Sequence, residues 1–99
     1  MIIHSVIFSL KHPKGSAAEK KFLADAQRIL SAIPGVQDFR RLRQVSRKND
    51  YDFGFSMEFS DQRAYDAYND HPDHIAWVRD RWVPEVHKFL EIDYEGYAG

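Results

Sequence analysis

Hydrophobic residues recur along the chain with two different spacings, which predict strands and helices in turn. Within residues 2–10 and 51–59 the apolar or aromatic positions alternate with others, as in strands with one buried face. Apolar residues at helical spacing follow from Phe22 to Ile33, where they make one stripe. Residues 36–45 form a more polar strand with three arginines, which favours an edge position. Residues 86–94 supply a last strand.

The first predicted helix begins at a capping box. Ser16 is followed three residues later by Glu19, and such a pair satisfies two N–H groups at a helix start, a contribution of about 1 kcal/mol. Pro34 and Gly35 end this helix. A turn at residues 46–50 then leads into the strand at 51–59.

The second helix is predicted to be broken in two. Asp61 can cap its start, and Ala64, Tyr65 and Tyr68 follow at helical spacing. Pro72 interrupts it, because a proline inside a helix loses a hydrogen bond and clashes with the preceding turn. Since proline suits the first position of a helix, we expect a new helix at residue 72, and we expect Pro84 to end it.

The order of elements is therefore βαββαβ in one domain, residues 1–99. This order most commonly gives an α+β, ferredoxin-like fold, in which a four-stranded antiparallel sheet carries its helices on one face. Ile3 and Ile7 then lie on the uncovered face of a central strand. Apolar groups on both faces of a strand indicate cover on both sides. We expect a homodimer whose sheets pack face to face.

Composition narrows the classes of function. The 14 basic and 15 acidic residues leave a net charge of -1, whereas nucleic-acid binders usually carry a basic surface. The chain has no cysteine, which excludes thiol catalysis, disulfides and zinc–thiolate sites. No apolar run approaches the roughly 20 residues that cross a bilayer, and the N-terminal segment resembles a strand more than a signal peptide. We therefore expect a cytoplasmic protein without nucleic-acid or membrane partners.

Four segments together resemble one known family. They are residues 3–8 with His4, residues 33–36, the run from Tyr68 to His71-Pro72-Asp73-His74, and residues 89–94. In this order and spacing they are similar to the stress-responsive dimeric α/β-barrel family, which includes a plant polyketide cyclase that makes olivetolic acid. The resemblance covers nearly the whole chain. It implies a dimer with a sheet-lined barrel and pockets between sheet and helices.

The resemblance also implies roles for three residues. His74 stands where the cyclase has its catalytic base, Tyr68 where a tyrosine holds the substrate carbonyl, and His4 where a strand histidine lines the site. The cyclase reaction is an intramolecular aldol closure and needs no cofactor. Trp77 and Trp82 are bulkier than a long acyl chain would tolerate, which disfavours a polyketide substrate here.

The residues support acid–base chemistry independently. His74 lies close to a helix start, where the helix dipole lowers the pKa of an imidazole and keeps it neutral, the form that acts as a base. The Tyr68 phenol can donate a hydrogen bond to a developing enolate oxygen. We expect the substrate or ligand to contact these residues and His4 together with His71, Phe8, Phe53, Phe55, Trp77 and Trp82.

Each of these polar residues also has a structural interpretation. His71 precedes a proline and can cap the second half-helix. His74 can cap or pack against the sheet, Tyr68 can be a core tyrosine with its hydroxyl at the rim, and His4 can be a buried, hydrogen-bonded residue. A metal site is a rival for the histidines: His71 and His74 with His4 or His87. Pro72 splits that pair across a helix start, so we expect no metal.

Three functions remain open. One is a cofactor-free enzyme that cyclises, isomerises or decarboxylates small carbonyl compounds, with His74 as base and Tyr68 as acid. Another is a non-catalytic, dimeric stress-response scaffold that binds a small apolar ligand in the same cavity. The third is a cofactor-free member similar to the monooxygenases of related dimeric barrels, since one fold hosts many chemistries.

Overall fold

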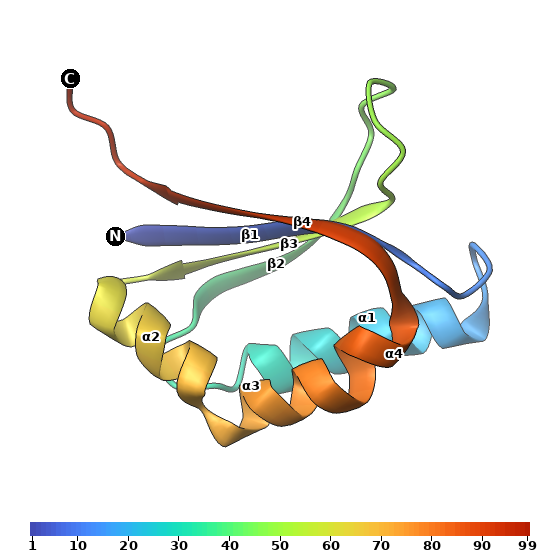
Figure 1. The fold of residues 1–99 in the computed structure, drawn as a ribbon, viewed down its shortest axis with the longest axis horizontal. Helices are drawn as coiled ribbons and strands as arrows, with labels where there is room; N and C mark the ends of the chain where they lie inside the picture. The colour runs from blue at the N-terminus through green and yellow to red at the C-terminus, as the bar shows by residue number, and fades with distance from the viewer.

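A single antiparallel sheet forms the frame of the molecule (Figure 1). The computed structural model describes all residues, 1–99. The strand order is β2-β3-β1-β4, so that β1 and β3 are central and the polar strand β2 lies at an edge, as predicted. The strands are β1 (Ile2–Leu10), β2 (Gln37–Arg43), β3 (Phe53–Phe59) and β4 (Val86–Glu95).

All helices cover the same face of this sheet, and Figure 1 shows the opposite face open. The ferredoxin-like βαββαβ arrangement predicted from the sequence is therefore confirmed. Several strand limits differ slightly from the prediction: β2 spans Gln37–Arg43 instead of residues 36–45, β3 begins at Phe53, and β4 extends to Glu95. The helices are α1 (Ala17–Leu30), α2 (Gln62–Asp70), α3 (Pro72–Trp77), a π-helical turn η1 (Val78–Trp82), and α4 (Val83–Glu85).

Of the two hydrogen bonds expected in the capping box at α1, one forms as predicted and the other goes to a different N–H group. The Ser16 hydroxyl accepts a hydrogen bond from the Glu19 N–H at 3.2 Å, as expected. The Glu19 carboxylate accepts from the Gly15 N–H at 3.1 Å, one residue before the cap. The reason is that the Ser16 N–H already donates to the Pro13 carbonyl.

The break in the second helix is built by His71 and Pro72. His71 leaves the helical conformation, with φ -66° and ψ 135°, and ends α2. Its Nδ1 then accepts the Asp73 N–H at 3.1 Å and caps α3, while Pro72 occupies the first turn, where no N–H is needed. The structure confirms that His71 is a helix cap. Tyr68 at the end of one half-helix and His74 in the next are thereby brought to the same side.

The helical path ends one residue after Pro84, at Glu85, close to the predicted end. The preceding turn is π-helical, and the Val83 N–H reaches back to the Val78 carbonyl. Pro84 then falls in the first turn of the three-residue helix α4, directly after the π-helical turn.

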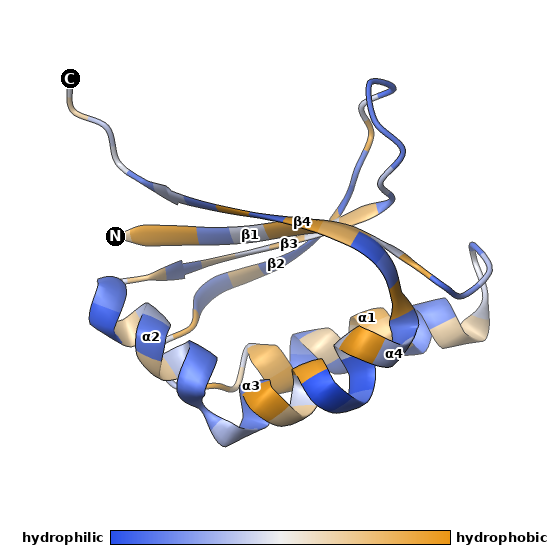
Figure 2. Ribbon diagram, viewed as in Figure 1, coloured by the Kyte–Doolittle hydropathy of each residue, from blue (hydrophilic) through white to orange (hydrophobic).

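The hydrophobic core lies between the sheet and the helices. Phe8, Phe22 and Phe59 are fully buried there. Figure 2 shows hydrophobic and hydrophilic positions alternating along the strands. On the open face, by contrast, Leu90 is 47% and Tyr94 54% exposed. No helix has the length and apolar character to cross a bilayer.

The His71 cap gives a test of the helix break. Replacing His71 with Ala removes the acceptor for the Asp73 N–H, and we expect the free energy of unfolding to fall by about 1 kcal/mol. Asparagine caps equally well, so His71→Asn should stay close to the wild type. Urea denaturation measures both. Equal losses in the two variants would contradict a capping role.

Candidate active site in the cavity between sheet and helices

A cavity of about 260 Å³ lies between the helix-covered face of the sheet and the helices α2, α3 and η1. Most of its wall is apolar. The polar lining residues come from three separate segments of the chain: β1, the α2–α3 region and β4. The lining includes His4, Tyr68, His74, Trp77, Trp82 and Glu91.

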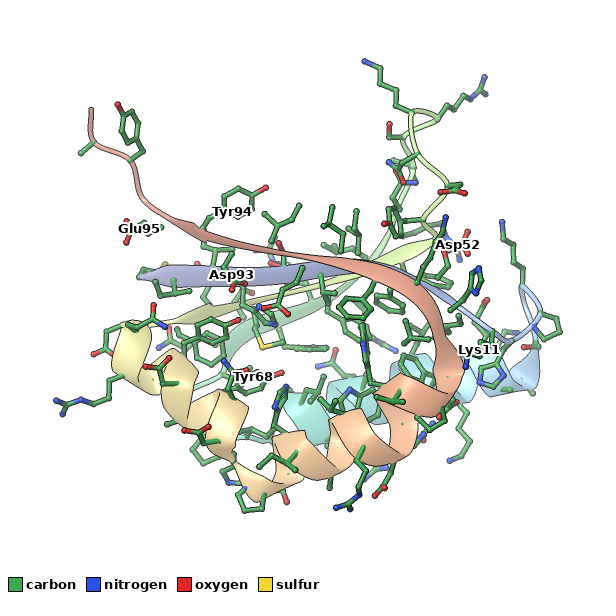
Figure 3. All side chains as sticks on the ribbon, viewed as in Figure 1. Lys11, Asp52, Tyr68, Asp93, Tyr94 and Glu95 are labelled. Carbon is green, nitrogen blue, oxygen red and sulfur yellow. The ribbon has the colours of Figure 1, made fainter.

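Tyr68 faces this cavity from α2, as Figure 3 shows by its position between helix and sheet. Its side chain is buried, with 2% of the residue exposed, and its hydroxyl makes no hydrogen bond to the protein. No fully buried side-chain nitrogen or oxygen lacks a partner, so the Tyr68 oxygen reaches open space, which is the cavity. Burial raises the pKa of this phenol, and the charge of Glu91 adds to the rise. Tyr68 therefore remains a hydrogen-bond donor at neutral pH.

His74 lies beside Tyr68, with 4.4 Å between the ring centroids. Its Nδ1 is 3.2 Å from the Asn69 carbonyl. Because a carbonyl only accepts, Nδ1 carries the proton and Nε2 keeps a lone pair without a protein partner. The pKa of His74 lies below its ordinary value, mainly because burial disfavours the charged ring. The direction is the predicted one, although burial, and not the helix dipole, is the main cause.

His4 is held in a separate hydrogen-bond network. Its Nδ1 donates to the Asp93 carboxylate at 2.6 Å, and the Tyr65 hydroxyl donates to the other Asp93 oxygen at 2.8 Å. Burial and the hydrogen bond to Asp93 raise the pKa of Tyr65. The His4 ring is 6.1 Å from that of Tyr68, and its Nε2, like that of His74, has no protein partner. The network fixes the orientation of His4 at the cavity wall.

The remaining predicted ligand contacts divide into two groups. Phe55, Trp77 and Trp82 line the cavity. The other three lie outside its wall. Phe8 is fully buried behind Trp82, with 5.1 Å between the rings; Phe53 packs beyond Phe8 at 6.0 Å; and His71 is used as the helix cap.

Several cavity residues were not anticipated from the sequence, above all Asn69, Phe89 and Glu91. Alternation in the last strand places Phe89, Glu91 and Asp93 on one face. What identifies this face is the pairing of β4 with β1, in which Asp93 lies opposite His4 and Glu91 opposite Val6. The alternation was visible in the sequence, but the register was not.

One group of side chains could hold a metal ion: His4, Glu91 and Asp93, whose ligand atoms lie within 4.8 Å of one another. This set differs from the one considered from the sequence, because His71, His74 and His87 do not belong to it. A metal would have to displace the short His4–Asp93 hydrogen bond. In this structure the three side chains belong instead to a hydrogen-bonded network with Tyr65.

Comparison with known proteins identifies the family. The model of the stress responsive A/B barrel domain (Dabb) matches residues 2–96. The chain therefore belongs to the Dabb family, as its sequence motifs indicated. Among curated proteins, none matches the chain.

Solved structures agree with this assignment. A Dabb family protein with a ferredoxin-like fold from Mesorhizobium loti is 66% identical, with a TM-score of 0.97, over 98% of this chain and 97% of that one. A dimeric ferredoxin-like protein of unknown function from Thermobifida fusca has a TM-score of 0.74 at 21% identity, over 96% and 90% of the two chains. A hydroxynitrile lyase from Passiflora edulis has a TM-score of 0.84 at 12% identity, over 99% and 94%. The last two show the fold alone.

The burial of His74 has a measurable consequence. We expect its imidazole to titrate with a midpoint below the ordinary 6.5 when followed by NMR, with His74→Gln to assign the signal. The unfolded chain then binds protons more readily than the folded chain. The contribution of His74 to the free energy of unfolding is therefore complete above about pH 6.5 and is lost as the pH falls through the pKa of His74 in the folded protein. A midpoint at or above 6.5 would contradict the buried, neutral base.

Proposed function

We propose that the cavity binds a small apolar or carbonyl compound and that the protein acts on it without a cofactor, with His74 as base and Tyr68 as acid. One observation carries this proposal: the free Nε2 of His74 and the free hydroxyl of Tyr68 belong to adjacent rings in the wall of the same cavity. A base and a hydrogen-bond donor in such an arrangement suit the removal of a proton next to a carbonyl group.

In the proposed reaction, His74 Nε2 takes a proton from the carbon next to the carbonyl. The electron pair of the broken C–H bond forms the C=C bond of an enolate, the π pair of the C=O bond moves to the oxygen, and the Tyr68 hydroxyl donates a hydrogen bond to that oxygen. Return of the proton from the imidazolium to another carbon gives isomerisation, and return of a solvent deuteron to the same carbon gives exchange. In ring closure the enolate carbon instead bonds to a second carbonyl carbon of the same molecule, and the oxygen of that carbonyl takes the proton from the imidazolium. General-base help contributes about 10²–10⁴-fold, enough for an activated carbon acid.

The size of the cavity narrows the ligand. An engineered apolar cavity of about 150 Å³ holds benzene, and the present cavity is about 260 Å³. One ring with a short substituent therefore fits, and the indole rings of Trp77 and Trp82 give it flat apolar surfaces. This volume, with two indole rings in the wall, disfavours a long linear acyl chain.

Exchange of carbon-bound hydrogen tests the proposal without knowledge of the natural substrate. Phenylacetone, a ring with a short ketone, should lose its activated hydrogens to D₂O faster with the protein than in buffer, as followed by ¹H NMR. We expect His74→Ala to slow the catalysed exchange by about 100-fold or more, and Tyr68→Phe to slow it less, because the base remains.

His87→Ala is the matched control, since His87 is an exposed histidine outside this cavity. It should exchange like the wild type. Circular dichroism must show that the His74 variant is folded. If the wild type binds the ketone but does not accelerate exchange, the protein is a non-catalytic ligand-binding scaffold, and the catalytic proposal fails.

We also propose that two copies of the chain pack their open sheet faces together. The support is the exposed apolar surface of this face, which Ile3, Leu42, Leu90 and Tyr94 share, because large exposed apolar patches mark interaction sites. The ferredoxin-like relative from Thermobifida fusca is itself described as dimeric. A partner of the same chain would bring an equal apolar face.

Sedimentation measures this directly. We expect a dimer at micromolar concentration and a shift to monomer in Leu90→Lys, which places a charge in the proposed contact. Ile75→Lys is the control, since Ile75 is 51% exposed but lies on the helical side. A monomeric wild type, or equal behaviour of the two variants, would overturn the dimer.

A further inference from the structure

We infer that the ligand of this cavity is an organic cation, a ring-bearing ammonium compound whose charged group lies against Glu91. The inference rests on the proposed function, since it names the class of ligand for the same cavity. Four features of the cavity support it: its charge, the scarcity of protein hydrogen bonds to Glu91, the free hydroxyl of Tyr68, and its aromatic wall.

The cavity carries negative charge without compensation. None of its lining residues is a lysine or an arginine, and Glu91 stands at its polar end, on the exposed edge strand β4. His4 and Asp93 form a pair beside it. If His4 is neutral, the group of three has a charge of -2, and if His4 is protonated, it has -1. In either state the polar end of the cavity attracts a cation and repels an anion.

One guanidinium does contact the wall, but its charge is already neutralised. Arg81 lies over the Trp77 ring at 5.4 Å. It binds Asp25 at 2.7 Å and Glu85 at 2.5 Å, and it is not among the lining residues. Arg81 therefore does not offset the charge of Glu91.

The protein itself supplies few hydrogen bonds to the carboxylate of Glu91, an exposed residue at the rim of the cavity. A tyrosine hydroxyl has a single proton to donate. The Tyr65 hydroxyl is 2.8 Å from Asp93 but 3.2 Å from Glu91, so it donates its hydrogen bond mainly to Asp93. Glu91 has no other donor in the protein. An ammonium group has three N–H donors and no acceptor, so it suits a carboxylate whose acceptor sites the protein leaves to solvent.

The other polar atoms of the cavity complement the same ligand. Tyr68 is 2% exposed, yet its hydroxyl has no protein partner and opens into the cavity. Its oxygen, together with the lone pairs on Nε2 of His74 and His4, offers further acceptors to a donor-rich group.

The apolar wall is rich in aromatic rings. Phe55, Trp77, Trp82 and Phe89 line the cavity, with the Trp82 and Phe89 rings 5.5 Å apart. Aromatic faces attract cations, and tryptophan does so best. They also suit the ring of the ligand. A divalent metal ion gains nothing from such a wall and would have to break the His4–Asp93 bond, so the organic cation is favoured.

Three small probes of nearly the same shape test the inference: benzylamine, which is an ammonium cation at neutral pH, benzyl alcohol, which is neutral, and benzoate, which is an anion. The chain has two tryptophans, and both line the cavity, so their indole N–H signals in NMR titrations report binding there. We expect benzylamine to bind at least fivefold more tightly than benzyl alcohol, as one partly exposed charge pair allows (about 1 kcal/mol), and benzoate to bind most weakly.

Glu91→Gln should remove the preference for benzylamine and leave the affinity for benzyl alcohol unchanged. Glu95→Gln is the matched control: it removes the same charge from the same strand at an exposed residue outside the cavity, and it should retain the preference. If benzyl alcohol binds as well as benzylamine, the inference fails while the proposed ligand cavity stands. If no probe moves the indole signals, both fail. A Glu91-dependent response to Mn²⁺ without any response to benzylamine would replace the organic cation with a metal.

Discussion

The site depends most on the pairing of β4 with β1. This register sets Asp93 across from His4 and Glu91 across from Val6, with Phe89 opposite Phe8. Because paired residues share a face of the sheet, the two carboxylates meet the histidine under the helices. The same register turns Leu90 and Tyr94 to the open face. A slip of one residue would exchange these two sets, so one set of hydrogen bonds determines both the polar end of the cavity and the surface available to a partner.

The helix break supplies the other half of the site. A continuous helix would carry Tyr68 and His74 at a spacing of six residues, which places them on different faces. The His71 cap and Pro72 redirect the chain, and the two rings come within 4.4 Å. The helix break at His71 and Pro72 therefore positions the side chains proposed as acid and base. The phenol and imidazole gain their properties from burial, which keeps one protonated and the other neutral.

Local patterns in the sequence were sufficient for the elements, the layer order and the His71 cap, because alternation, capping residues and prolines act within a few positions. Together with the family resemblance they singled out His4, Tyr68 and His74, which line the cavity. They could not reveal Glu91, whose importance depends on pairing between segments more than 80 residues apart. Nor could they separate Trp82, at the wall, from Phe8 directly behind it, since both are large aromatics. The π-helical turn before Pro84 was also not predicted; it lets Trp77 and Trp82, five residues apart, both line the cavity.

A crystal structure of the protein with phenylacetone tests the central claim most directly, namely that Tyr68 and His74 share a cavity open to a ring-bearing ligand. The account predicts the carbonyl oxygen within hydrogen-bond distance of the Tyr68 hydroxyl, the activated carbon beside His74 Nε2, and the ring against Trp77 or Trp82. The account would be contradicted if the tryptophan side chains filled this space and the Tyr68 hydroxyl were hydrogen-bonded to the protein itself.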